Sequence, residues 1–207
     1  FLVCLWPALT RAQLNPSVIP SQDEFRAARP AIPHLLRPLP NRLLDGKVAN
    51  DLPNIVLIGY WPPTNEMIRE FSSGPAHNPT GWIGENWEGR GYNVYGFFPE
   101  FPNGLGIGEG DFQADYQSTS QDFWTIVPAL KPVAVLSFGR AKANKDWEIE
   151  LVTHNSTSWI GDYRTPFHPT PNPPDSSLHA SLARNSVFPS AAIIGALKAD
   201  VPSLTPF

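Results

Sequence analysis

The sequence predicts an α/β fold, a three-layer αβα sandwich around a mostly parallel central sheet. Two short apolar runs, within residues 54–60 and 133–140, each end close to a glycine and have the length of buried strands. Between them, apolar side chains recur at helical spacing over residues 114–130. Strands that alternate with helices are typical of a parallel sheet whose two faces are covered by helices.

Composition favours one folded domain. Of the 207 residues, 42% are hydrophobic and only 16% are charged, so most of the chain can build a core. The net charge is −4 and no basic block is present, which gives no indication of a nucleic-acid partner. Because Cys4 is the single cysteine and the five histidines lack metal-binding spacing, we expect no disulfide framework, no metal and no cofactor.

The N-terminal segment is apolar and short. Residues 1–12 are typical of the remainder of a secretory signal, with Thr10 and Ala12 as the small residues before a cleavage point. This interpretation predicts an extracytoplasmic protein, secreted or periplasmic. A buried N-terminal strand is the alternative. The run is too short to span a bilayer, so we expect no membrane span.

Residues 13–50 contain regularly spaced prolines and are predicted to form an extended lead-in to a domain over 51–207. That domain opens with the strand at 54–60, followed by a helix over 67–71 with Thr64 or Asn65 as its N-cap. The Gly- and Trp-rich stretch 81–91 either packs as an Ω-loop or presents Trp82 and Trp87 to a ligand. An aromatic strand over 92–98 follows.

The second half of the domain repeats the alternation. A Gly-rich connection over 99–111 leads to the helix over 114–130, and Pro132 ends that helix. We expect Glu109, Asp111 and Asp115 in a solvated loop and helix start. After the strand that begins at 133, a second strand is expected over 147–152. A helix over 190–199, with Ser190 as a possible cap, and the start of a strand at 200–202 complete the chain.

Candidate binding residues lie where predicted strands end. In open α/β sheets, ligands sit in loops at the carboxyl ends of strands. The turn at Tyr60 and Trp61 follows the first strand, and the loop at Gly139 and Arg140 follows the strand at 133. Glu150, on the next strand, is the acid to inspect.

These segments together resemble pyroglutamyl peptidase I, a cysteine peptidase family with a doubly wound α/β fold. Residues 55–62 are similar to that family's opening strand and aromatic loop, and Asn65 is similar to an asparagine a few residues later. Leu130, Lys131 and Pro132 resemble the helix end before the family's Gly-Gln loop, which reads Gly139-Arg140 here. Glu150 lies at the distance where the family places its catalytic glutamate. The resemblance covers roughly residues 54–205.

The resemblance implies a set of site residues. Glu150 would be the catalytic acid that orients the imidazole of a Cys–His–Glu triad. The implied substrate-binding residues are Tyr60, Trp61, Asn65, Gly139 and Arg140. The family's Cys and His follow the last matched segment, so residues 1–207 offer no usable nucleophile and we expect this chain to be inactive on pyroglutamyl substrates. Pro63 and Arg140 replace family residues, which points to another substrate.

Ordinary structural roles stay open for each of these residues. Glu150 could face solvent or pair with Lys142 or Lys145, and Arg140 could form a salt bridge at a strand end. Tyr60 and Trp61 could pack against a neighbouring helix, and Asn65 could cap one. Most of the histidines are expected on the surface or in loops.

Two functions are therefore carried forward. The first is an exported hydrolase-type domain that, when complete, cleaves an amide or small peptide by a Cys–His–Glu mechanism. The alternative is a non-catalytic ligand- or peptide-binding pseudoenzyme domain that uses Tyr60, Trp61, Arg140 and the Trp-rich loop. The sequence leaves the oligomeric state open.

Overall fold

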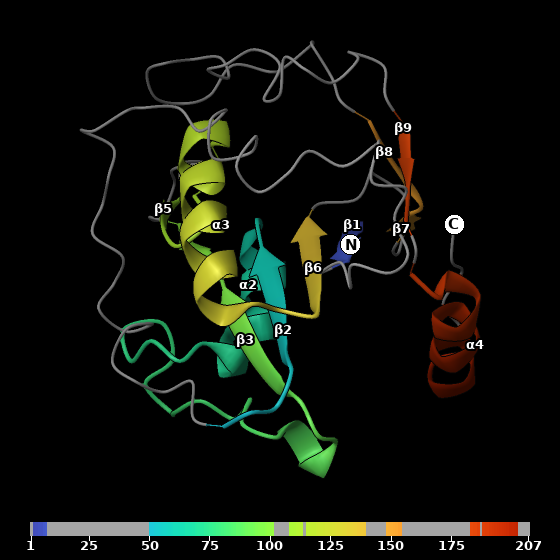
Figure 1. Ribbon diagram of the computed structural model, residues 1–207, viewed down its shortest axis with the longest axis horizontal. Coiled ribbons are helices and arrows are strands. Elements are labelled where there is room, and N and C mark those ends of the chain that lie inside the picture. The colour runs from blue at the N-terminus through green and yellow to red at the C-terminus, as the bar shows by residue number, and fades with distance from the viewer. Residues whose placement is uncertain are drawn as a thin grey trace.

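The chain folds as an α/β protein, as the sequence predicts (Figure 1). The computed structural model describes residues 2–7, 50–101, 108–113, 115–139, 148–154, 183–186 and 188–202. Arg140 and nearly all of the expected lead-in over 13–50 lie outside these residues. Helices and a small parallel sheet make up the described part.

The main sheet has five strands in the order β3-β2-β6-β1-β7. Its strands are β1 (Leu2–Pro7), β2 (Asn54–Gly59), β3 (Asn93–Phe97), β6 (Ala134–Gly139) and β7 (Glu148–Glu150). β2 pairs in parallel with both β3 and β6. β1 is antiparallel to β6 and parallel to β7, so β1 and β7 run against the other three strands. The predicted strands β2, β3 and β6 are confirmed.

The strand expected over 147–152 is interrupted. β7 ends at Glu150, Leu151 is exposed, and the chain continues as β8 (Val152–His154). β8 leaves the main sheet and pairs antiparallel with β9 (Ala183–Asn185). The run that the sequence predicts as one strand therefore forms two strands, β7 in the main sheet and β8 in a separate two-stranded sheet.

Leu2–Pro7 forms a strand between β6 and β7. This is the alternative that the sequence left open for residues 1–12. A cleaved leader stays a prediction for this segment.

Helix α2 (Pro62–Ile68) begins earlier than the sequence suggests. Pro62 and Pro63 occupy its first positions, where a missing backbone N–H costs nothing. Trp61 is the N-cap, so neither Thr64 nor Asn65 caps the helix. The Thr64 hydroxyl instead accepts a bond from the Trp61 N–H at 3.2 Å and donates to the Trp61 carbonyl at 2.8 Å. A 3-10 turn, η3 (Arg69–Phe71), continues α2.

The other two helices match their predicted ranges closely. Helix α3 (Tyr116–Leu130) ends at Lys131, whose left-handed backbone lets its N–H bond to the Val127 carbonyl. Helix α4 (Ser190–Asp200) has Pro189 as its N-cap, so Ser190 is its first residue and not its cap. The strand expected from 200 is wrong, because α4 includes Asp200 and the chain turns at Pro202.

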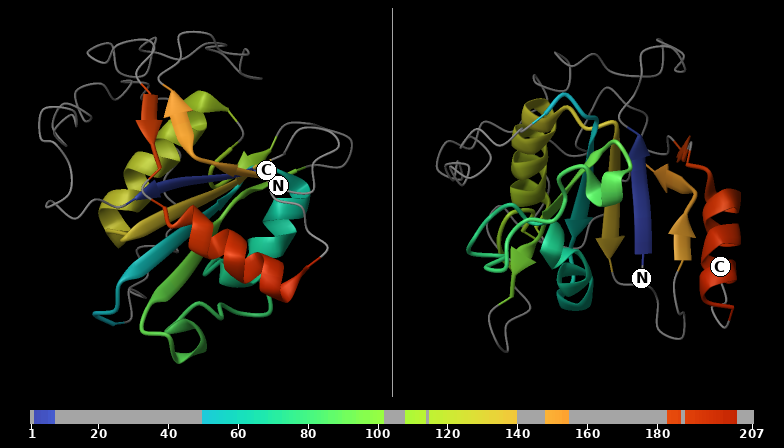
Figure 2. Two further views of the ribbon diagram at one scale, coloured as in Figure 1. Left: turned by 90° about the vertical axis from the view of Figure 1, so that its right-hand side faces the viewer. Right: turned by 90° about the horizontal axis from the view of Figure 1, so that it is seen from below.

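Helices α2 and α3 cover opposite faces of the sheet (Figure 2). Val56 and Ile58 of β2 pack with Ile126 and Leu130 of α3. Leu57, which points the other way, packs with Ile68 of α2. Alternation along β2 therefore divides the core into two apolar clusters.

Buried asparagines join the amino ends of β2 and β3 to the end of α3. Asn54 donates to the Leu130 carbonyl at 2.7 Å, and Asn93 donates to the Asn54 side-chain oxygen at 3.0 Å. Both asparagines are buried. These bonds align the strands at one end and leave the carboxyl ends to diverge into loops.

Gly59 provides a test of the packing between β2 and α2. A Cβ at Gly59 would lie 2.4 Å from Asn65 Oδ1 and 3.2 Å from Ile68 Cδ1. We expect Gly59→Ala to lower the free energy of unfolding by about 1–3 kcal/mol through overpacking. As a control, Gly195→Ala in α4 meets no atom within 4 Å. It should raise stability by about 0.5–1 kcal/mol because alanine favours helix. Urea unfolding of both variants measures the difference, and equal effects would contradict the close packing at Gly59.

Candidate functional site

The carboxyl ends of β2 and β6 flank the point where the chain reverses its path through the sheet. From β2 the chain passes through α2 to β3 on one side, and then through α3 to β6 on the other side. In open α/β sheets, ligands bind in the crevice at this topological switch point. The turn after β2 and the carboxyl end of β6 are therefore the first candidate site, called here the switch-point site.

Hydrogen bonds hold the turn after β2 against the end of β6. The Tyr60 N–H donates to the Phe138 carbonyl at 3.0 Å, and the Thr64 hydroxyl lies 3.2 Å from the same oxygen. Thr64 is fully buried, so this contact anchors the start of α2 on the end of β6. The structure thus brings the turn at Tyr60 to the strand end that includes Gly139.

The aromatic residues of the first turn have different environments. Tyr60 is half-buried and packs on the α3 side of the core. Trp61 is 38% exposed. Gly139 is half-buried as the last residue of β6, and Arg140 lies outside the described residues. Tyr60, Trp61 and Gly139 form one rim, while the role of Arg140 stays a prediction.

Asn65 lies inside the protein. Its Nδ2 donates to the Pro99 carbonyl at 2.6 Å, and its side chain is almost completely buried against Gly59. Within the described residues, its Oδ1 has no hydrogen-bond partner. The helix-cap interpretation is wrong, and the observed bond makes Asn65 a tie between α2 and the end of β3. A direct contact with ligand stays a prediction.

Glu150 is not beside the two turns. Its backbone pairs with Cys4 of β1, and Cys4 pairs with Ser137 of β6, so β1 separates Glu150 from β6. Two strand spacings amount to about 10 Å. β7 also runs opposite to β6, so it heads away from the rim at Gly139. The catalytic role of Glu150 stays a prediction, and this topology gives it no support. Lys142 and Lys145 lie outside the described residues.

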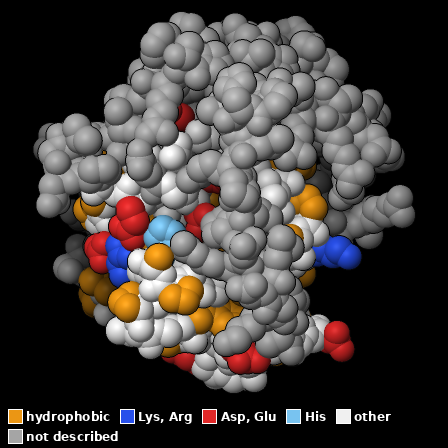
Figure 3. Space-filling model, turned by 90° about the vertical axis from the view of Figure 1, so that its left-hand side faces the viewer, with side chains coloured by type: hydrophobic (Ala, Val, Ile, Leu, Met, Phe, Trp, Pro, Cys, Tyr) orange, Lys and Arg blue, Asp and Glu red, His pale blue; other side chains and the backbone are white. Residues whose placement is uncertain are grey.

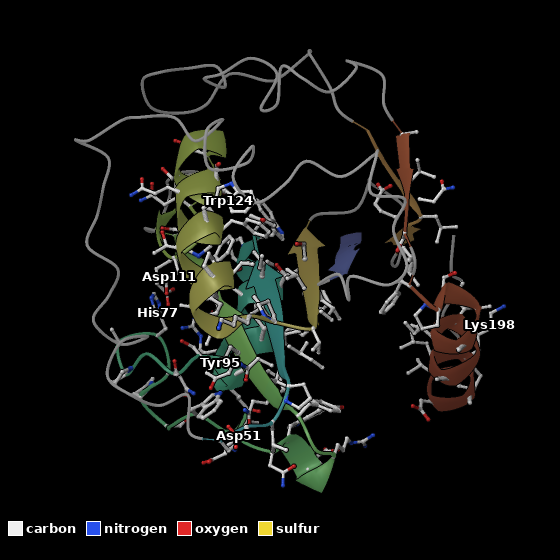
Figure 4. All side chains as sticks on the ribbon, in the orientation of Figure 1. Asp51, His77, Tyr95, Asp111, Trp124 and Lys198 are labelled. Atoms are coloured by element: carbon white, nitrogen blue, oxygen red, sulfur yellow. The ribbon has the colours of Figure 1, made fainter. Side chains whose placement is uncertain are left out.

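A second cluster of polar side chains lies at the carboxyl end of β3, where no sequence motif predicts a site (Figures 3 and 4). The chain there forms a hairpin of β4 (Pro99–Glu100) and β5 (Glu109–Gly110). His77 Nδ1 is 3.1 Å from Glu100 Oε1, and His77 Nε2 is 3.6 Å from Asp111 Oδ2. Arg69 Nη1 donates to Glu100 Oε1 at 2.7 Å. We call Arg69, His77, Glu100 and Asp111 the histidine cluster.

Arg69 organises the histidine cluster. Its guanidinium also pairs with Glu66 at 2.5 Å, donates to the His77 carbonyl at 2.6 Å and lies over the Phe98 ring at 4.9 Å. Hydrogen bonds to Glu66 and then Glu100 raise the pKa of Arg69. The bond from Arg69, with a smaller one from His77, lowers the pKa of Glu100 despite partial burial. Ionised Arg69 and Glu100 therefore form the fixed frame around His77.

One expectation about this region is wrong in part. Asp111 and Asp115 are buried instead of solvated, although Asp115 does lie at a helix start, as the N-cap of α3. His77 lies in a loop, as expected for most of the histidines, and is 9% exposed. The members of the histidine cluster are spread over residues 69–111, so no local spacing reveals them. One signal was available, since Glu100 directly follows the predicted strand at 92–98, where ligand-facing residues collect.

The Trp-rich loop packs on the domain. Trp82 stacks on Tyr95 with 4.7 Å between ring centroids, and its Nε1 donates to the Val94 carbonyl at 2.8 Å. Trp87 meets Phe71 edge-on at 5.6 Å. Of the two roles considered for these tryptophans, packing is the one observed.

The described parts of the chain contain no group of three or more His, Cys, Asp or Glu side chains that is arranged to hold a metal ion. None of the helices there is long and apolar enough to cross a membrane.

Comparisons with protein-family models, with curated proteins and with solved structures find no match for this chain. Function must therefore be argued from the geometry of the two sites.

The lowered pKa of Glu100 predicts acid sensitivity. A carboxylate whose pKa is lower in the folded state stabilises folding above its ordinary value, near 4.5, and this contribution disappears as pH falls through the lowered value. Glu100→Gln should therefore reduce stability at neutral pH, and the gap from wild type should close below about pH 4. Urea unfolding across pH measures this. Glu88→Gln is the control, because Glu88 pairs only with exposed Arg90. A gap that is constant with pH would contradict the prediction.

Proposed function

We propose that this protein is a ligand-binding α/β domain that holds a small peptide or amide at the switch-point site. The observation that carries the proposal is the bond from the Tyr60 N–H to the Phe138 carbonyl, which joins the turn after β2 to the end of β6. This junction lies where ligands bind in open α/β sheets. We further propose that the complete domain is the predicted three-layer αβα sandwich.

The side chains of the rim support a flat, weakly polar ligand. Trp61 offers partly exposed aromatic surface, and Tyr60 lies next to it on the same turn. Gly139 is half-buried and ends β6 without a side chain, which lets a ligand approach the backbone closely. Planar amide groups stack well on aromatic rings, so small peptides and amides fit this rim.

A binding role is favoured over catalysis because the predicted acid is not at the rim. A triad requires its acid within hydrogen-bond reach of the imidazole. Strand β1 lies between Glu150 and the turn at Gly139. The arrangement therefore supports the non-catalytic alternative.

The exported amide hydrolase stays a second proposal. The observation that favours it is the parallel pairing of β2 with β6, which places the carboxyl ends of both strands side by side, as the resemblance to pyroglutamyl peptidase I also requires. It needs a nucleophile and a base that reach the same rim.

Trp61→Ala tests the binding proposal. The probes are N-blocked dipeptide amides, including pyroglutamyl-alanine amide, titrated calorimetrically into the full chain. Loss of the aromatic wall should weaken binding by about fivefold to tenfold. Met67→Ala is the matched control, since Met67 is 49% exposed on the same helix. Absence of binding by every probe, or equal affinity in Trp61→Ala and wild type, would contradict the proposal.

Turnover separates the two proposals. We expect residues 1–207 to release no amine from pyroglutamyl-alanine amide, because Glu150 lies away from the rim. Mass spectrometry of the reaction mixture measures this. Turnover that Glu150→Gln abolishes while leaving the unfolding midpoint unchanged would establish the hydrolase instead.

A further inference from the structure

The histidine cluster contains an imidazole whose orientation is fixed by neighbouring charges. Glu100 Oε1 receives bonds from Arg69 Nη1 at 2.7 Å and from His77 Nδ1 at 3.1 Å. Arg69 is itself held by Glu66 and by the His77 carbonyl. Arg69 therefore holds the Glu100 carboxylate in place against His77 Nδ1.

This frame selects one tautomer. A neutral imidazole carries a single N–H, and an ionised carboxylate can only accept a hydrogen bond. The low pKa of Glu100 keeps its carboxylate ionised, so the hydrogen must be on Nδ1 of neutral His77. Its Nε2 is then left with a lone pair.

The surroundings of Nε2 leave that lone pair available as an acceptor. Among the described residues, the carboxylate that faces Nε2 is that of Asp111, whose Oδ2 is 3.6 Å away and too far for a hydrogen bond. The Phe98 ring meets the imidazole edge-on at 5.2 Å, and a Cβ at Gly110 would lie 3.3 Å from Cε1. Phe98, Gly110 and Asp111 thus pack around the ring, and none of these described residues donates a hydrogen bond to Nε2.

The charges around His77 are mainly negative. Glu100 from β4 and Asp111 from the residues after β5 face the ring directly. Arg69 from η3 reaches Glu100, and Glu66 from α2 lies behind Arg69. The histidine cluster and Glu66 thus contain three carboxylates and one guanidinium, which favours a donor group at Nε2 and disfavours an anionic ligand.

We infer that His77 is an oriented hydrogen-bond acceptor, whose Nε2 binds a ligand group that donates an N–H or O–H. Glu100 and Arg69 are positioning residues for the ring. The site lies at the carboxyl end of β3, and β2 separates it from the crevice between β2 and β6. It does not depend on the function proposed for the switch-point site.

The tautomer can be measured directly. The full chain is labelled with nitrogen-15 histidine, and long-range proton–nitrogen spectra are recorded at about pH 8, where histidine is ordinarily neutral. The His77 signals are those that persist when the other histidines are replaced by glutamine, namely His34, His154, His168 and His179. We expect the Nδ1–H form to predominate at His77, the reverse of the preference of free histidine.

Two alanine variants separate orientation from a merely structural role. Glu100→Ala removes the acceptor and should shift His77 to the Nε2–H form. Glu66→Ala removes the other carboxylate on Arg69 without touching the ring, and should keep Nδ1–H. Far-UV circular dichroism confirms folding of both. The inference is overturned if wild-type His77 is mainly Nε2–H, a result that requires no variant of the cluster, or if both variants change the tautomer equally.

Discussion

The parallel pairing of β2 with β3 and β6 is the constraint on which the rest of the structure depends. It places an apolar strand between two others, so each face of β2 must be covered, and α2 and α3 do this from opposite sides. At the amino ends, Asn93 donates to Asn54, which donates in turn to the Leu130 carbonyl. Both candidate sites lie at the carboxyl ends.

The two sites share one short structural element. α2 begins at the switch-point site, where Thr64 contacts the Phe138 carbonyl, and leads into Arg69 of the histidine cluster. Between them, Asn65 fastens α2 to the Pro99 carbonyl. A displacement of α2 would therefore change both sites, because Thr64 bonds to the first site and Arg69, directly after the helix, bonds to the second. This linkage makes α2 the natural route for any coupling between them.

Local sequence signals predicted those parts of the fold that depend on local physics. The apolar runs of β2 and β6, the aromatic run of β3 and the helical spacing of α3 each carry their own signal. The start of α2 was missed because Pro62 was interpreted as part of a loop, although proline suits the first turn of a helix. The direction of β7 and the meeting of His77 with Glu100 and Asp111 depend on long-range pairing. No pattern within a single segment contains that information.

The place of β1 in the sheet has a consequence for how the chain acquires its structure. Leu2–Pro7 is synthesised before the other strands of the sheet, and both of its neighbours, β6 and β7, are made more than a hundred residues later. Loop closure over such a separation is entropically costly and slow. The apolar segment of β1 therefore stays unpaired until β6 and β7 have been synthesised. The last half of the sheet thus assembles late, and the nascent chain needs protection from aggregation in the interval.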